Sequence, residues 1–191
     1  GIGPSKANEL FKKHITLDKL LVEMKKVKGD FKKIPNENIL DSLTHHQLLG
    51  IKYFQDIESK IPREEIKSIK IKLNKFIKQL NKDYEVHICG SFRRKKLTSG
   101  DIDVLILHPE LKTQDEIDES DENTLGNIVE HLTNKKLLID HLTEGGTTKY
   151  MGICKYKKTS LGRRIDIRFI PYESKAAAIL YFTGSGNFNK Y

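Results

Sequence analysis

The sequence predicts an α+β protein in which an all-helical N-terminal part precedes a small mixed or antiparallel sheet with flanking helices. Two observations lead to this fold class. Apolar residues recur at helical spacing up to about residue 80, and alternating strand-like runs follow residue 83. We therefore expect a boundary near Lys82, with a helical part over residues 1–82 and an α+β part over residues 83–191.

The N-terminal part reads as a series of helices. The stretch "GIGPS" is typical of a glycine turn, and an amphipathic helix follows it. Residues 1–46 otherwise suggest short helices, and residues 47–58 suggest another. The clearest helical pattern follows Pro62, which suits the first turn of a helix. Its apolar positions are Ile66, Ile69, Leu73, Phe76, Ile77 and Leu80.

In the second part, apolar and polar residues alternate as they do in β-strands. Strands are expected over residues 84–90, 101–108, 137–143, 149–157 and 163–170, with helices near 123–135 and 173–182. The stretch "DEIDESDE" at 115–122 holds six acidic residues in eight, which is most simply a solvated loop.

The charge and hydropathy of the chain indicate which classes of partner it binds. The net charge is +8 and the pI is about 9.3, a balance common in proteins that bind phosphate polyanions. No apolar run approaches the roughly 18–20 residues that span a bilayer, so we expect no membrane partner. Cys89 and Cys154 lie within apolar strand-like runs without metal-type spacing. They are expected to be buried free thiols in a reducing compartment.

Two aspartates stand one residue apart at the start of a strand. Side chains alternate along a strand, so Asp101 and Asp103 share one face and Ile102 points the other way. Asp166 in "RRIDIRF" has the same setting. Taken alone, either motif is more often an ordinary half-exposed strand edge. Three carboxylates from two strands can also hold two Mg²⁺ about 4 Å apart, the arrangement used for phosphoryl transfer.

The residues around these aspartates favour the metal interpretation. Gly90-Ser91 follows a strand, and a turn there can present backbone N–H and hydroxyl groups to a phosphate. Arg93 and Arg94 supply guanidinium groups that suit phosphate oxygens. A Gly-Ser turn, two arginines and then Gly100-Asp-x-Asp is the order that a nucleotidyltransferase needs.

The segments "CGSFRRKKLTSGDIDVL", "RRIDIRFIP" and "YFTGSGNFNK" resemble the family X DNA polymerases, the group of DNA polymerase beta. "GIGPS" and "THHQLLGIKYFQDIESKIPREEI" occur in the expected order, so the resemblance covers essentially the whole chain. It implies a fingers subdomain with a helix-hairpin-helix and a nucleotidyltransferase palm. A lyase domain upstream and a thumb downstream are expected to lie outside this chain.

The resemblance also implies roles for single residues. Asp101, Asp103 and Asp166 would be catalytic and would bind two Mg²⁺, for which Mn²⁺ can substitute, and Asp166 would also activate the primer 3′-OH. The incoming nucleotide would contact Ser91, Arg94, Gly100, Tyr181, Phe182, Gly184, Asn189 and Lys60. DNA would contact Gly1, Gly3, Ser5, Lys6 and Arg164, and the backbone of Ile2 would hold Na⁺ or K⁺ at the hairpin.

Three positions depart from the family pattern. Lys60 stands where the family has an arginine near the triphosphate, which keeps the charge but not the bidentate fork. Lys95 stands where glycine is frequent after the two arginines. Gly186 replaces an aspartate beside the nucleotide base, which puts base contact in question rather than catalysis.

The function expected from this resemblance is DNA-directed DNA synthesis of the repair type, in which a monomer fills short gaps in primed or gapped double-stranded DNA with deoxynucleoside triphosphates. A template-independent terminal transferase, or another nucleotidyltransferase, is one alternative, and a non-catalytic DNA-binding module is another. The chain alone is expected to be weakly active or inactive. An intracellular location follows: the nucleus for a eukaryote, the cytoplasm or a virus factory for a virus.

Overall fold

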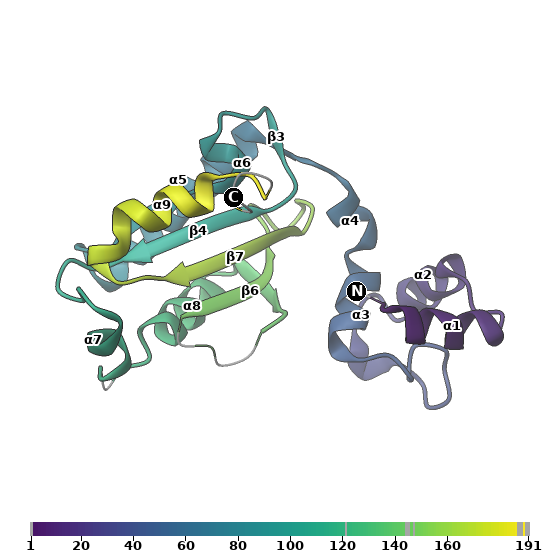
Figure 1. The fold of residues 1–191 in the computed structure, drawn as a ribbon. Helices are drawn as coiled ribbons and strands as arrows, with labels where there is room; N and C mark the ends of the chain where they lie inside the picture. The colour runs from purple at the N-terminus through teal and green to yellow at the C-terminus, as the bar shows by residue number, and fades with distance from the viewer. Residues whose placement is uncertain (1, 121, 144–145, 147, 187–188, 190–191) are drawn as a thin grey trace. The chain divides into compact units, whose positions relative to one another are not determined.

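The computed structural model describes residues 2–120, 122–143, 146, 148–186 and 189 (Figure 1). The chain forms two compact units, Gly1–Gln55 and Asp56–Tyr191.

The first unit is helical. It contains α1 (Pro4–Lys12), α2 (Leu17–Lys26), the 3₁₀ helix η1 (Phe31–Lys33) and α3 (His45–Lys52), and α4 (Phe54–Glu58) follows. Thr16 begins α2 by accepting a hydrogen bond from the Lys19 N–H, and Thr44 with Gln47 forms a capping box at α3. The buried core of this unit consists of Leu10, Leu20, Met24, Val27, Leu40, Leu43, Leu48 and Ile51.

The second unit contains a five-stranded mixed sheet in the order β2-β4-β7-β6-β5. Its strands are β2 (Glu85–Ile88), β4 (Ile102–Leu107), β5 (Leu138–His141), β6 (Lys149–Cys154) and β7 (Arg163–Phe169). The pair β4 and β7 is parallel, and the other neighbours are antiparallel. The mixed sheet with flanking helices is the predicted α+β architecture. A separate pair, β1 (Ile61–Pro62) with β3 (Thr98–Ser99), was not predicted.

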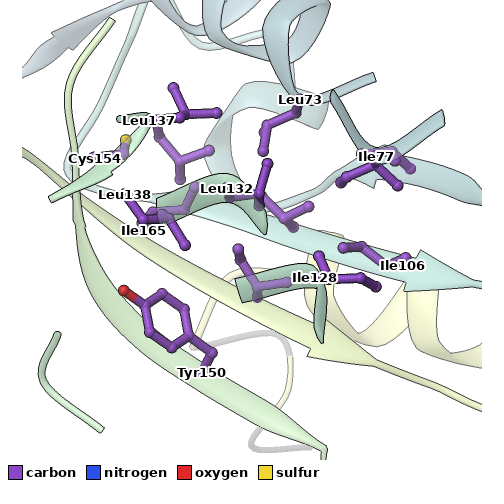
Figure 2. Packing of buried hydrophobic residues seen from close by; sticks show 14 of the residues in the cluster. Leu73, Ile77, Ile106, Ile128, Leu132, Leu137, Leu138, Tyr150, Cys154 and Ile165 are labelled. Carbon is purple, nitrogen blue, oxygen red and sulfur yellow. The ribbon is translucent and has the colours of Figure 1, made fainter. Parts of the chain in front are cut away.

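Helices cover both faces of this sheet. On one face, α5 (Arg63–Leu80) and α8 (Thr124–Asn134) close the larger core, which Figure 2 shows from close by. On the other face, the short helix α6 (Gly90–Arg93) and α9 (Lys175–Thr183) are neighbours, and α9 follows η2 (Tyr172–Ser174). Cys89, Leu105, Leu107 and Ile170 form a smaller cluster on that face, against which Ala178, Ile179 and Phe182 pack.

The compact units divide after Gln55, not near Lys82 as the sequence predicted. The reason is the apolar stripe of α5. Ile66, Ile69, Leu73 and Ile77 are each 0% exposed and belong to the same core as the sheet. Helical periodicity therefore identified the helix correctly, but the layer against which α5 packs is set by contacts with strands that come later in the chain.

Three local predictions also need correction. Pro62 lies in β1 and caps α5 instead of occupying its first turn. The Gly90-Ser91 turn is the start of a one-turn helix, α6. The first part of the acidic segment belongs to α7 (Gln114–Asp118), because Thr113 and Glu116 form a capping box and the acidic residues of the first turn suit a helix N-terminus.

Both cysteines are buried and free, as predicted. Burial is the main cause that raises the pKa of each thiol. None of the helices in the described residues combines the length and apolar character of a membrane span.

A buried ion pair fixes the start of β7. Arg163, whose side chain is 6% exposed, donates two hydrogen bonds to the Glu65 carboxylate at 2.8 and 2.7 Å. It also donates to the Ser59 carbonyl at 3.1 Å. The pair therefore connects the first turn of α5 with the strand that carries Asp166.

We predict that Glu65→Ala lowers the free energy of unfolding by about 3 kcal/mol, because the buried Arg163 charge loses its partner. Glu64→Ala is the matched control. The neighbouring Glu64 pairs with Lys67 on the surface, where its side chain is 79% exposed, and its loss should cost less than about 0.5 kcal/mol. Urea unfolding of both variants measures the difference, and equal losses would contradict the prediction.

Candidate active site

The three predicted carboxylates meet at one edge of the sheet. The parallel pairing of β4 with β7 places Asp103 directly opposite Asp166, and Asp101 immediately precedes β4. One carboxylate oxygen from each residue lies within 4.8 Å of the others. Asp101 is exposed, Asp103 is half-buried and Asp166 is only 9% exposed. The site is therefore open to solvent on one side and enclosed by the sheet on the other.

Crowding and burial disfavour the charge on Asp103. Burial, followed by the neighbouring Asp101 and Asp166 carboxylates, raises the pKa of Asp103 to about 6, although the Arg168 and Lys149 charges act in the opposite direction. A bound cation would relieve this repulsion. Oxygen ligands from three carboxylates suit a hard divalent cation such as Mg²⁺, so the residues fit the metal expected from the sequence.

Two arginines share the strand face of Asp166. Arg164 donates to Asp166 Oδ1 at 2.8 Å and to the Gly152 carbonyl at 2.8 Å. Arg168 Nη1 lies 3.8 Å from Asp103 Oδ1, and its guanidinium carbon lies 4.3 Å from the centre of the Phe182 ring. Arg168 was not predicted from the sequence, although its position two residues after Asp166 on a strand was a signal that could have identified it.

Gly90 brings the backbone of α6 against the carboxylate triad. Its φ is +60°, and a Cβ atom built there would lie 2.6 Å from Asp103 Oδ2. The neighbouring Cys89 N–H donates to the Asp103 carbonyl at 2.8 Å. Only glycine combines this positive φ with this close approach.

The predicted phosphate-binding residues gather beside the triad. Ser91 Oγ donates to Ser99 Oγ at 2.7 Å, which places the start of α6 beside the residues that lead into Asp101. Lys60 Nζ would lie 3.6 Å from a Cβ built on Gly100, so the lysine amine borders the same turn. The structure thus brings Ser91, Gly100 and Lys60 to one side of the carboxylates.

Arg94 links α6 to the end of α9. Its Nη1 donates to the Thr183 carbonyl at 2.8 Å and approaches the Gly184 carbonyl at 3.4 Å. Tyr181 and Phe182 precede these carbonyls, with their rings edge to face at 5.0 Å. Asn189 Nδ2 donates to the Tyr181 carbonyl at 2.7 Å. The residues predicted for the sugar side of a nucleotide therefore form one connected group.

The predicted DNA-contacting residues of the first unit lie around α1. Gly1 is outside the described residues. Gly3 is the N-cap of α1, Ser5 is in its exposed first turn, and the partly buried Ile2 packs against the core of its unit. Lys6 is hydrogen-bonded to Glu9 at 2.9 Å and to Ser42 at 3.3 Å. The described residues show the helix after the glycine turn, but a complete helix-hairpin-helix is not shown.

Two of the departures from the family pattern have local explanations or consequences. Lys95 is exposed and has a φ of +63°, a conformation that glycine adopts more easily, which fits a position where glycine is frequent. A Cβ built on Gly186 would meet nothing within 4 Å, so the space that an aspartate would fill is open.

Comparison with known proteins places this site in a family. The model of the DNA polymerase beta palm matches residues 60–172, a range that contains all three carboxylates. DNA polymerase lambda of Rattus norvegicus is 34% identical over 165 residues, which cover 84% of this chain and 28% of the rat protein. DNA polymerase lambda of Arabidopsis thaliana is 30% identical over 200 residues, which cover 100% of this chain and 33% of the plant protein. The chain thus spans a third or less of the length of these relatives.

We predict that Gly90→Ala weakens binding of Mn²⁺ to the triad at least tenfold, because the new methyl group would displace Asp103 and the left-handed backbone would be strained. Gly50→Ala in α3 is the control, since a Cβ at Gly50 meets nothing within 4 Å. Isothermal titration calorimetry with Mn²⁺ compares the two variants. Unchanged Mn²⁺ affinity in a folded Gly90→Ala protein would show that the close approach is unimportant.

Proposed function

The chain belongs to the family X DNA polymerases, the family of DNA polymerase beta, and from this premise we propose that the protein is a repair-type, DNA-directed DNA polymerase. It adds deoxynucleotides to a primer 3′-OH in short gaps. The observation that carries the proposal is the position of Asp101, Asp103 and Asp166 within 4.8 Å of one another, beside a turn that suits a triphosphate.

In this proposal the triad holds two Mg²⁺, or Mn²⁺ in their place. The metals, when bound, neutralise charge on the transferring phosphoryl group and on the attacking oxygen. Asp166 has its Oδ1 engaged by Arg164, which leaves Oδ2 to accept the proton of the primer 3′-OH. Arg164, on the same strand face, contacts the primer end.

The nucleotide lies between α6 and the end of α9 in this proposal. Ser91, Arg94, Gly100 and Lys60 bind the triphosphate, because they offer hydroxyl, guanidinium, backbone and ammonium groups beside the metals. The sugar and minor-groove side of the nucleotide pocket is formed by Tyr181, Phe182, Gly184 and Asn189.

The first unit supplies sequence-independent DNA contacts. Gly3, Ser5 and Lys6 lie at or near the start of α1, where backbone N–H groups and the helix N-terminus favour a phosphate. Gly1, which is outside the described residues, joins these DNA contacts in the proposal. The backbone of Ile2 would hold Na⁺ or K⁺ at this turn. The protein acts as a monomer on gapped or primed double-stranded DNA.

We propose an intracellular site of action, in the nucleus of a eukaryotic cell. The relatives named above come from a mammal and a plant, and neither supports a viral origin.

Replacing a metal ligand tests the function directly. We predict that Asp101→Ala or Asp103→Ala in the whole protein that carries this chain lowers nucleotide addition more than about a hundredfold, because transition-state charge loses its neutralisation. Primer extension on gapped DNA with Mg²⁺ and all four deoxynucleotides measures the rate. Asp115→Ala, in the exposed first turn of α7, is the control with the same chemical change.

Two results would overturn parts of the proposal. Near-normal extension by either ligand variant would remove the two-metal assignment. Equal extension of a single strand and of a gapped duplex would favour the template-independent terminal transferase.

DNA binding provides a second test. We predict that the affinity of the 191-residue chain for labelled gapped DNA is weak, independent of sequence and steeply reduced by salt, because cationic side chains and helix-terminal amides contact phosphates. Fluorescence anisotropy at several salt concentrations measures the slope. A flat salt dependence would argue against an interface dominated by phosphate contacts.

A further inference from the structure

Gly152 of β6 is connected to both faces of the sheet. It pairs with Ile165 of β7, one residue before Asp166. Its carbonyl accepts the hydrogen bond of Arg164 on the face that carries the triad. Its missing side chain would point toward the opposite face, where Tyr150 belongs to the core closed by α5 and α8 (Figure 2). A substitution at Gly152 would therefore disturb contacts on both faces of the sheet.

Tyr150 occupies the space that a side chain at Gly152 would need. The two residues are two positions apart on one strand and so share a face. A Cβ built on Gly152 would collide with the Tyr150 hydroxyl oxygen and would lie 2.5 Å from its ring carbon Cζ and 2.8 Å from the Asp140 carbonyl. No residue larger than glycine fits without moving the ring or the strand.

Tyr150 cannot move aside without losing a buried hydrogen bond. Its side chain crosses to β5, where the hydroxyl is hydrogen-bonded to His141 Nδ1 at 2.6 Å and lies 3.4 Å from the Asp140 carbonyl. The residue is only 4% exposed, and the two rings pack edge to face at 5.6 Å. A buried hydroxyl without its partner is costly, so the Tyr150–His141 pair holds β6 at the level of Gly152.

From these contacts we propose that Gly152 and Tyr150 are positioning residues for the carboxylate triad, acting through Arg164. The Tyr150–His141 pair fixes the Gly152 peptide, whose carbonyl holds one nitrogen of the Arg164 guanidinium. Because that group is planar and rigid, its other nitrogen is aimed at Asp166 Oδ1. Asp166 is thereby held in a fixed orientation within the triad. The inference deepens the proposed function, on which the biological meaning of the metal site rests.

Mn²⁺ binding to the 191-residue chain tests this path without DNA, nucleotide or catalysis. We expect Gly152→Ala to weaken Mn²⁺ binding about tenfold, as the loss of an outer-shell contact to a metal ligand does. Ile128→Val is the control, because Ile128 is 0% exposed in the same core but belongs to α8, not to the strands that carry Gly152 and Arg164. It should leave the Mn²⁺ affinity within about twofold of the original, as expected for independent sites.

A double-mutant cycle separates positioning from general loss of structure. If Gly152 acts through Arg164, then Gly152→Ala should change the Mn²⁺ affinity by less than about twofold in an Arg164→Ala background. Calorimetry with Mn²⁺ on the original chain, the two single variants and the double variant gives the coupling between Gly152 and Arg164. The inference would be overturned if Gly152→Ala lowered the Mn²⁺ affinity equally with and without Arg164, or if it did not lower the affinity when Arg164 is present.

A second variant covers the case in which Gly152→Ala does not fold. Tyr150→Phe keeps the ring and removes only the hydroxyl that bonds to His141, so it should weaken Mn²⁺ binding severalfold, again only when Arg164 is present. Normal Mn²⁺ affinity in folded Tyr150→Phe would overturn its role. Lack of polymerase activity in the whole protein would count against the proposed function alone, because these measurements require no turnover.

Discussion

The parallel pairing of β4 with β7 is the constraint on which the site depends. It sets Asp103 opposite Asp166, although 62 residues separate them in the chain, and it brings Asp101 to the same sheet edge. Antiparallel pairing of β2 with β4 and of β6 with β7 then surrounds the pair with backbone hydrogen bonds. A shift of one residue would turn Asp166 into the core and Ile165 or Ile167 toward the triad, so burial of the isoleucines also fixes the carboxylates.

The electrostatic repulsion among the three carboxylates acts most clearly on Asp103. Its pKa is raised by burial and by its two acidic neighbours, and the surrounding groups reduce this repulsion only in part. Arg168 is 3.8 Å away, and Arg164 is bonded to Asp166 instead. A site that remains electrostatically strained in this way is suited to bind cations, whose charge removes the repulsion.

Two glycines allow close packing in the elements around the triad. Gly90 allows α6 to contact the Asp103 carboxylate, while Gly152 leaves room for the Tyr150 ring on the face of β6 opposite the triad. The ion pair between Arg163 and Glu65 adds a third constraint, because it joins β7 to α5 through side chains that are largely buried. The triad is thus held by packing and hydrogen bonds from both layers of the second unit.

The sequence by itself predicted most of the elements and the three carboxylates that the structure brings together. Helical spacing located α5, alternation located β2, β4, β6 and β7, and the D-x-D pattern identified Asp101 and Asp103 as sharing a face. These features are local, so they can be read from neighbouring residues. Tertiary structure alone decided which layer α5 joins, that β1 pairs with β3, and that the Gly152 carbonyl meets the Arg164 side chain. Those outcomes depend on contacts between residues far apart in the chain, where periodicity carries no information about the partner.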